Sequence, residues 1–430
     1  MANSLGKRFR SKKLHHYLQN SNEHLFHAYC ILAAFTTYFC MYAFRKPFSV
    51  ATFEAADQVF EVDYKIILIT AQVLGYTLSK FMGIKVVSEV KGKHRGKSIL
   101  LLIGIAELAL LGFALTPAPY NILFMFLNGM PLGMVWGLVF GYLEGRKSTE
   151  LLGAGLSASY IVASGAVKSV GKYFLQSGVS EFYMPLVVGL CFAPLLLIAV
   201  FLLNNIPKPT KEDEQLRTKR KPMYDKDRWR FFKTFAPGLF PLTLLYMLLT
   251  AYRDFRDNFA REIWDAVGYG GRPELFTATE IPIAFAVLIS LATIMYIRNN
   301  QKALMAIHIL MLFGSVLIGL STLAFQLQWI NPITWMTTIG LGLYLAYVPY
   351  GCVLFDRLIA ATKFIGTAGF MIYLTDAFGY LGSVFLMFYK NFGQPNLSWL
   401  DFFISYSYVT SIFCGICFII SLRYFLAKTT

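Results

Sequence analysis

Long, nearly uninterrupted runs of apolar residues dominate the pattern along the chain. Residues 183–203 and 305–325 are two such runs, and neither contains a single Asp, Glu, Lys or Arg. A run of about 18 or more apolar residues is long enough to cross the hydrocarbon core of a bilayer, which is about 30 Å thick. Because lipid offers no partners to backbone N–H and C=O groups, such runs must be helical. The pattern therefore predicts an integral, all-α membrane protein.

The polar interruptions divide the apolar segments into twelve predicted transmembrane helices. We expect two six-helix bundles related by a pseudo-twofold axis, with spans at 25–48, 64–86, 98–116, 120–143, 151–175, 182–204, 234–260, 278–297, 303–327, 332–355, 365–388 and 401–424.

The longest polar stretch lies between the sixth and seventh predicted spans and contains the segment KPTKEDEQLRTKRK. It predicts an N-terminal bundle with a basic tail (1–205), a cytoplasmic linker (206–233) and a C-terminal bundle (234–430).

Weak internal similarity indicates that the two bundles are a duplicated unit, the arrangement by which two-bundle transporters build a site between halves. Three pairs share a nearly constant offset of 211 to 213 positions: Arg45 and Arg256, Glu144 and Asp356, and Tyr160 and Tyr373.

Composition and charge agree with a membrane protein. Hydrophobic residues make up 56% of the chain and charged residues only 15%, against about 25% charged residues in a soluble domain. The formal net charge is +15, but most lysines and arginines fall in the loops of one side. Positive loops face the cytoplasm, so we expect both termini to be cytoplasmic. The basic excess then reflects topology and contact with the lipid bilayer, and a nucleic-acid partner is not expected.

Ionisable groups inside a span are costly and mark function by default. The first candidates are Tyr38, Tyr42 and Arg45, whose spacings of four and three put them on one helix face. An arginine beside phenol hydroxyls is suited to bind an oxyanion, because its planar fork makes bidentate bonds. The alternative is an arginine that extends to the outer interface beside Lys46.

The second candidate group lies in the seventh predicted span: Arg253, Asp254, Arg256 and Asp257. The repeat can be aligned in two ways. Arg256 matches Arg45 because both lie in an FRxxF segment, whereas Arg253 matches Arg45 because both have hydroxyl-bearing residues seven and three positions before them. We expect one arginine to face the cavity and the other to pair with Asp254 or Asp257. In the alternative interpretation all four form a salt-bridge cluster at the outer end.

Further intramembrane charges are Lys168 in the fifth span and Asp376 in the eleventh. Lys168 is a candidate cavity cation or, alternatively, an interfacial lysine. Asp376 could balance a cavity cation or carry a coupling proton, or it could form a purely structural pair. Glu144 and Asp356, beside Arg146 and Arg357 at cytoplasmic ends, are interpreted as latch or packing charges. No Walker loop, metal cluster or nucleophile–base pair is found, so we expect neither an enzyme nor a cofactor or metal.

Twelve helices, a central linker and a basic loop between spans 2 and 3 resemble the major facilitator superfamily. Its loop signature is present in degenerate form at Glu89-Val-Lys-Gly-Lys-His-Arg95, following Lys80. More specifically, the segments Tyr42–Ala51, Tyr76–Gly83 and Leu127–Gly129 are similar to the organophosphate:phosphate antiporter branch. This resemblance implies that phosphate binds one arginine from helix 1 and one from helix 7, here Arg45 and either Arg253 or Arg256. It places Tyr160 near the position of a substrate-binding histidine of helix 5.

The leading hypothesis is secondary transport of a small anionic solute, a phosphorylated metabolite exchanged for phosphate by rocker-switch alternating access. A second hypothesis is proton-coupled transport of a carboxylate or other organic anion through Asp376. A third is a non-transporting receptor or scaffold that uses the basic stretch 208–233 for partners. The family resemblance implies a monomer in a bacterial inner membrane.

Overall fold

The structure, a computed structural model, describes residues 11–53, 63–90, 92–210, 212–213, 225–362 and 368–429. Every regular element in these ranges is a helix. The chain forms two compact units. Unit 1 comprises Met1–Arg217 and Pro273–Thr277, and unit 2 comprises Thr218–Arg272 and Ala278–Thr430. Of the predicted linker 206–233, residue 211 and residues 214–224 lie outside the described part.

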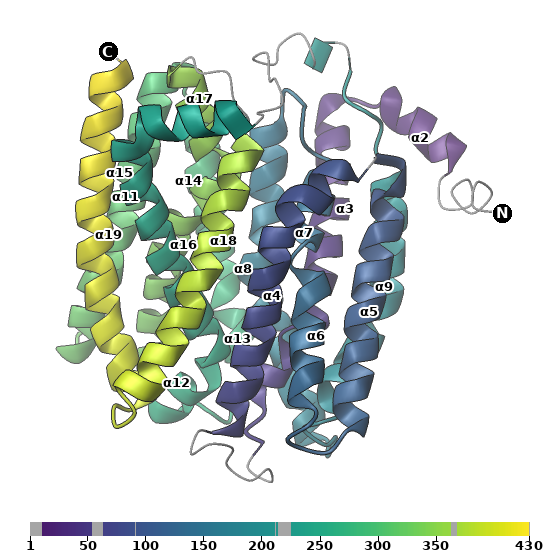
Figure 1. Cartoon of the computed structure of the whole chain (residues 1–430), viewed down its shortest axis with the longest axis vertical. Coiled ribbons are helices and arrows are strands. Elements are labelled where there is room, and N and C mark those ends of the chain that lie inside the picture. Colours follow the sequence, from purple (N-terminus) through teal and green to yellow (C-terminus); the bar gives the residue numbers. More distant parts are fainter. Residues whose placement is uncertain are drawn as a thin grey trace. The chain divides into compact units, whose positions relative to one another are not determined.

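Unit 1 is a bundle of long helices with short connecting elements (Figure 1). Its elements are α2 (Lys12–Gln19), α3 (Glu23–Ala43), η1 (Pro47–Val50), α4 (Tyr64–Glu89), η2 (Gly92–His94), α5 (Arg95–Leu115), α6 (Ile122–Leu132), α7 (Val135–Phe140), α8 (Thr149–Gln176) and α9 (Met184–Asn204).

Unit 2 is built in the same manner, and α13 straddles the boundary between the units. Its elements are α11 (Asp225–Asn258), α12 (Ala260–Ala266), α13 (Leu275–Ala278), α14 (Glu280–Met295), α15 (Asn300–Gln326), α16 (Pro332–Cys352), α17 (Leu354–Thr362), α18 (Ala368–Phe388), η3 (Tyr389–Gly393) and α19 (Trp399–Thr429).

The predicted fold class, an all-α multi-pass membrane protein, is confirmed. Among the described residues ten helices are long and apolar enough to cross a membrane, and α16 with α17 makes an eleventh, bent by 54°. The 21-residue α18 lies where the eleventh span was expected. Two details differ from the prediction. The tenth span bends after Cys352, and the helix of the seventh begins at Asp225, inside the predicted linker.

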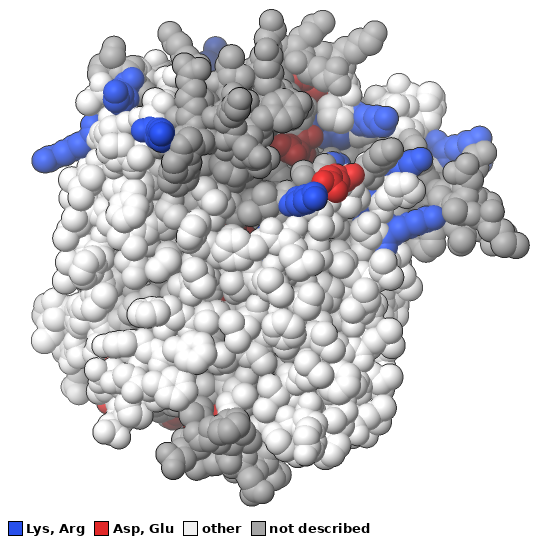
Figure 2. All heavy atoms as spheres, in the orientation of Figure 1, with Lys and Arg blue, Asp and Glu red and all other residues white. Residues whose placement is uncertain are grey.

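Apolar side chains cover the outer faces of the helices. In α5, Leu101, Leu108 and Leu115 are 65%, 67% and 64% exposed, and their spacing of seven puts them on one face. A water-soluble protein rarely exposes such a continuous apolar face, whereas a helix in lipid requires one. The surface over α5 and α9 carries almost no charge along its length, and Lys and Arg gather at the end where α2 lies (Figure 2).

Helices within each unit approach closely where they carry glycine. A Cβ atom on Gly75 of α4 would lie 2.1 Å from the carbonyl oxygen of Phe126, and one on Gly129 of α6 would lie 2.1 Å from that of Gln72. In unit 2 the same holds for Gly314 of α15 and Gly342 of α16, at 2.5 and 2.6 Å from each other's carbonyl oxygens. Small residues of this kind let membrane helices pack backbone to backbone.

Candidate functional site

The end of α3 is buried inside unit 1, and two amide side chains satisfy its backbone. Nδ2 of Asn128 donates to the carbonyl oxygens of Phe44 and Ala106, each at 3.0 Å. Nε2 of Gln72 donates to the carbonyl oxygen of Arg45 at 2.9 Å and to Oδ1 of Asn128 at 2.7 Å. A helix end leaves its last carbonyls without intrahelical partners, so these amides from α4 and α6 hold the backbone that carries Arg45.

Two buried cations share one aromatic ring in unit 1. The guanidinium carbon of Arg45 lies 3.6 Å from the ring centre of Tyr76, and Nζ of Lys80 lies 5.2 Å from the same point. Both cations are only 2% exposed, so the side chain of Arg45 does not extend to the surface. The ring contributes cation–π attraction to each. The two charges lie no more than about 9 Å apart, the sum of the two distances.

The other candidates of unit 1 are also buried. Tyr38 and Tyr42 are 4% and 5% exposed, and their rings meet edge to face at 5.6 Å between centroids. Tyr160 of α8 is 8% exposed. Lys168 of α8 is 4% exposed, with Nζ 5.7 Å from the ring centre of Phe276. The side chain of Lys168 is thus buried.

In unit 2, Arg253 is the centre of a buried polar cluster. Its Nη1 donates to the hydroxyl of Tyr347, and its Nη2 donates to the hydroxyl of Tyr380 at 2.7 Å. Nη2 also lies 3.0 Å from Oδ1 of Asp254, which forms an ion pair with it. The guanidinium carbon is 4.6 Å from the ring centre of Tyr347. Two phenols and one carboxylate therefore hold the guanidinium in place.

A chain of hydroxyl groups connects this arginine to Asp376. The hydroxyl oxygens of Tyr246 and Tyr347 lie 2.9 Å apart, and that of Tyr246 lies 3.0 Å from Oδ1 of Asp376. Each phenol has a single proton to donate. When Tyr246 donates its proton to Asp376, the hydrogen bond between the two phenols must therefore come from Tyr347 as the donor. Arg253, Tyr347, Tyr246 and Asp376 then form one continuous hydrogen-bonded row across α11, α16 and α18.

Arg256 has a different environment from Arg253. Its Nη1 lies 2.7 Å from Oε1 of Glu280, the first residue of α14, and its Nη2 donates to the carbonyl oxygen of Met336 at 3.1 Å. We expected Asp254 or Asp257 to pair with the arginine that does not face a cavity. Arg253 does pair with Asp254, whereas Asp257 is half-buried and Arg256 pairs with Glu280. The latter pairing lies between helices, which the spacing along a single helix did not reveal.

Of the predicted loop-motif and latch residues, Lys80 lies inside α4 and is buried, whereas Glu89, Arg95, Glu144 and Asp356 lie near helix ends or in loops. Glu89 at the end of α4 is exposed, whereas Glu144 and Asp356 are half-buried. Nη1 of Arg95 donates to the carbonyl oxygen of Gly141. These positions are compatible with loop packing.

The arginines beside the two predicted latch acids bind backbone and amide groups of other segments. Nη2 of Arg146 donates to the carbonyl oxygen of Pro207. Nη1 of Arg357 donates to the carbonyl oxygen of Ile297 and to Oδ1 of Asn300. The side chain of Tyr373 lies outside the described part of the structure.

Seven side chains of these clusters were not among the predicted site residues: Gln72, Tyr76, Asn128, Tyr246, Glu280, Tyr347 and Tyr380. Gln72 and Glu280 are polar or acidic groups inside predicted spans, and that signal alone marks an intramembrane residue for attention. Tyr347 and Tyr380 have no such signal, because tyrosines are frequent in this chain. Within the described ranges no group of three or more His, Cys, Asp or Glu could hold a metal ion.

Comparison with protein families gives one match over most of the chain. A family model described as "Family of unknown function (DUF5690)" matches residues 47–428. No curated protein matches the chain by sequence.

Comparison with solved structures shows the fold. A POT family transporter in complex with a thioalcohol-conjugated peptide has a TM-score of 0.63 at 13% sequence identity, covering 93% of this chain and 96% of that one. A D-xylose–proton symporter has a TM-score of 0.61 at 13% identity, covering 94% and 98%. A POT family transporter in complex with 5-aminolevulinic acid has 0.61 at 12%, covering 93% and 96%. The chain thus has the major-facilitator fold of these transporters, and the organophosphate branch stays a prediction.

Proposed function

The chain belongs to the family described as "Family of unknown function (DUF5690)". We propose that it is a secondary transporter of a small anionic solute. The fold supports transport, because the solved structures that share it are titled as transporters. The observation that carries the anionic part is the pair of buried cations, Arg45 and Lys80, on the ring of Tyr76.

Two like charges this close in a protein interior repel each other. At about 9 Å and an effective dielectric constant near 20, the repulsion is about 2 kcal/mol, and it rises if the charges are closer. A bound anion between or beside them reverses the sign of this interaction. Arginine adds a planar fork that binds phosphate or carboxylate through two parallel hydrogen bonds. The cluster is therefore suited to an anion that enters unit 1.

In unit 2 the contacts favour Arg253 over Arg256 as the solute-binding arginine. Arg256 is held by the carboxylate of Glu280 and a backbone carbonyl. Arg253 is held in part by two neutral phenols, and a phenol can rotate away or donate its own proton to an incoming anion. We assign the solute-binding role to Arg253 and a structural role to Arg256.

The solute class that fits best is an organophosphate exchanged for inorganic phosphate. This choice rests on the cationic character of the cluster and on the similarity of the segments around Arg45, Tyr76 and Asn128 to the organophosphate antiporter branch. In an exchanger the solute must be bound for the transporter to change its state, so binding energy shifts an existing equilibrium between conformations.

Counterflow in proteoliposomes tests this function. Vesicles loaded with unlabelled phosphate should accumulate labelled phosphate from outside without a pH gradient, and a panel of external sugar phosphates and glycerol phosphate should compete. Absence of counterflow with phosphate and with every ester of the panel would reject phosphate exchange.

The row of groups from Arg253 to Asp376 favours a second candidate function, proton-coupled transport of an organic anion. A carboxyl group linked through two phenols to a cation can exchange a proton when the charge near that cation changes. One of the structures that shares the fold is titled a D-xylose–proton symporter. A symporter should accumulate its solute when a pH gradient is imposed, whereas an exchanger should swap phosphate without one.

A further inference from the structure

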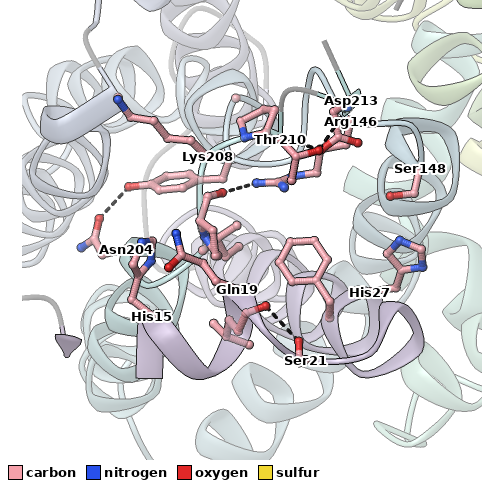
Figure 3. A pocket seen from close by; sticks show the side chains of 18 of the residues that line it. His15, Gln19, Ser21, His27, Arg146, Ser148, Asn204, Lys208, Thr210 and Asp213 are labelled. Atoms are coloured by element: carbon pink, nitrogen blue, oxygen red, sulfur yellow. Dashed lines mark hydrogen bonds between the residues drawn. The ribbon is translucent and has the colours of Figure 1, made fainter. Parts of the chain in front are cut away.

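Unit 1 contains a large cavity that the transport proposal does not use. Its volume is about 1090 Å³. It lies between α2, the start of α3, the start of α5, the turn after α7 and the segment that follows α9, and it is lined by residues of all five (Figure 3). The helices α3 and α5 begin here and α9 ends here. The cavity therefore lies at the end of the bundle where the membrane spans begin or end.

The walls of the cavity carry an excess of positive charge. Among the described lining residues three are acidic, and six are Lys or Arg: Lys93, Arg95, Lys97, Arg146, Lys147 and Lys208. The four lysines are exposed and Arg95 is half-buried. Side chains of this kind can reorient toward a ligand at small cost, and they supply long-range attraction for an anion.

Arg146 is the buried cation of the cavity. It is 9% exposed, its Nη2 donates to the carbonyl oxygen of Pro207, and its guanidinium carbon lies 5.0 Å from the ring centre of Phe26. Among the residues that the structure describes, none accepts a hydrogen bond from its buried Nε. Burial lowers the pKa of Arg146 from its ordinary value. A buried guanidinium with an unused donor is what an oxyanion ligand would satisfy.

The charge of Asp213 acts on Arg146, but the carboxylate oxygens of Asp213 accept hydrogen bonds from other donors. Figure 3 shows Asp213 beside Arg146. Oδ1 of Asp213 accepts from the backbone N–H of Lys147 at 3.0 Å, and Oδ2 accepts from the backbone N–H and the hydroxyl of Thr210 at 2.8 and 3.0 Å. Burial alone raises the pKa of Asp213, but these hydrogen bonds, together with the positive charge of Arg146, outweigh it and hold the pKa below its ordinary value. Asp213 thus ties the segment after α9 to the turn before α8 and shapes the wall.

We propose that this cavity is a second binding site, which takes a phosphate-bearing ligand against the guanidinium of Arg146 with the surrounding lysines as secondary contacts. Phosphate offers several acceptor oxygens and fits both the fork of an arginine and the point charge of lysines. Because the cavity lies at the ends of three spans, the headgroup of an acidic phospholipid could reach it. Because the cavity is also open to solvent, a soluble phosphate compound could enter it. This inference does not depend on the transport function.

Native mass spectrometry of the full chain in a neutral detergent tests the lipid source. The probe is dioleoyl phosphatidylglycerol, with dioleoyl phosphatidylcholine as the zwitterionic reference. Isothermal calorimetry with pyrophosphate tests the soluble source. Arg146→Gln should weaken binding of the probe by roughly tenfold, the loss of one charge-assisted bidentate contact. Arg298→Gln, an exposed arginine of unit 2, removes the same charge elsewhere and should leave binding unchanged.

Because Arg146 also holds the carbonyl of Pro207, a variant that keeps this contact is included. Lys93→Gln with Lys147→Gln changes only exposed side chains and should weaken binding severalfold while the melting temperature stays the same. Binding of phosphatidylglycerol alone assigns the site to a lipid headgroup, and binding of pyrophosphate assigns it to a soluble phosphate compound. The inference is overturned if the wild-type chain binds neither probe, or if the cavity variants bind as tightly as Arg298→Gln.

Discussion

The guanidinium of Arg256 and the carboxylate of Glu280 form a buried ion pair between α11 and α14, with Nη1 and Oε1 2.7 Å apart. Their side chains are only 6% and 10% exposed. The two arginines of α11 therefore have different surroundings, since Arg256 is bound by an acid of a second helix while Arg253 is bound by two phenols and by its neighbour Asp254. The pair connects α11 with α14, a contact that the spacing of residues along one helix cannot predict.

Breaking this pair on one side should destabilise unit 2. Glu280→Gln leaves Arg256 as a buried charge without its counter-charge, which costs about 3–5 kcal/mol for buried pairs. The melting temperature in detergent, followed by tryptophan fluorescence, should fall clearly. Replacing both partners by Arg256→Met and Glu280→Leu should restore much of the loss. A single variant as stable as the wild type would contradict a structural role for the pair.

The contact between α4 and α6 should not tolerate a side chain at Gly129. The Cβ atom of Gly129→Ala would lie 2.1 Å from the carbonyl oxygen of Gln72, so the two helices must separate, at a cost of about 1–3 kcal/mol. The matched control is Gly104→Ala in α5, where a Cβ atom meets nothing within 4 Å. Thermal unfolding should show a loss for the first variant and none for the second. Equal melting temperatures would contradict the close approach.

The amides of Gln72 and Asn128 should act as one unit on the end of α3. Asn128→Leu leaves the carbonyls of Phe44 and Ala106 without this donor, at a cost of about 1–3 kcal/mol. Gln72→Leu should cost a similar amount. Since the two amides also bond each other at 2.7 Å, the double variant should lose less than the sum of the single losses. Strictly additive losses in a double-mutant cycle would show that the amides act independently.

The Asp376→Asn variant separates the two transport hypotheses. If Asp376 carries a coupling proton, accumulation driven by a pH gradient should disappear in this variant, while counterflow at equal pH continues. If the protein is a phosphate exchanger, an imposed pH gradient should change phosphate counterflow little, both in the wild type and in Asp376→Asn. Asn keeps the size of the side chain, so folding should be retained, and a melting-temperature measurement checks this. Unchanged gradient-driven accumulation in Asp376→Asn would remove Asp376 from coupling.

The all-helical membrane fold was predictable because the thickness of a bilayer sets the length of an apolar helix. Residues 184–203 lie in α9 and residues 305–325 in α15, where the spans were expected. The bend between Cys352 and Leu354 follows Pro349 and Gly351. An interior proline is a usual cause of a kink, so the sequence does carry a signal for this bend that hydropathy alone misses. Hydropathy reports how apolar a segment is, but it does not report whether the helix axis changes direction within that segment.

Within the candidate site, the sequence pointed mainly to the ionisable residues, whose burial in a membrane costs free energy. Arg45, Arg253, Arg256 and Asp376 were selected as charges inside predicted spans, the arginines also from the spacing of neighbouring residues and the family resemblance, and all four are buried. Apart from Asp254, which follows Arg253 on α11, the partners described above come from other helices, as Gln72 does for the backbone of Arg45, and only the packing of the bundle shows them. The cavity at Arg146 was hidden for the same reason, since its walls come from five separate segments.

Transport by Arg45→Lys tests the central claim most directly. This variant keeps the charge over the ring of Tyr76 and loses the fork that binds an oxyanion in two places. Counterflow of labelled phosphate in proteoliposomes should fall roughly tenfold or more, the effect of about 1.4 kcal/mol, whereas Arg298→Lys at an exposed position should transport like the wild type. Undiminished counterflow in Arg45→Lys would contradict an anion-binding role for the buried cations of unit 1.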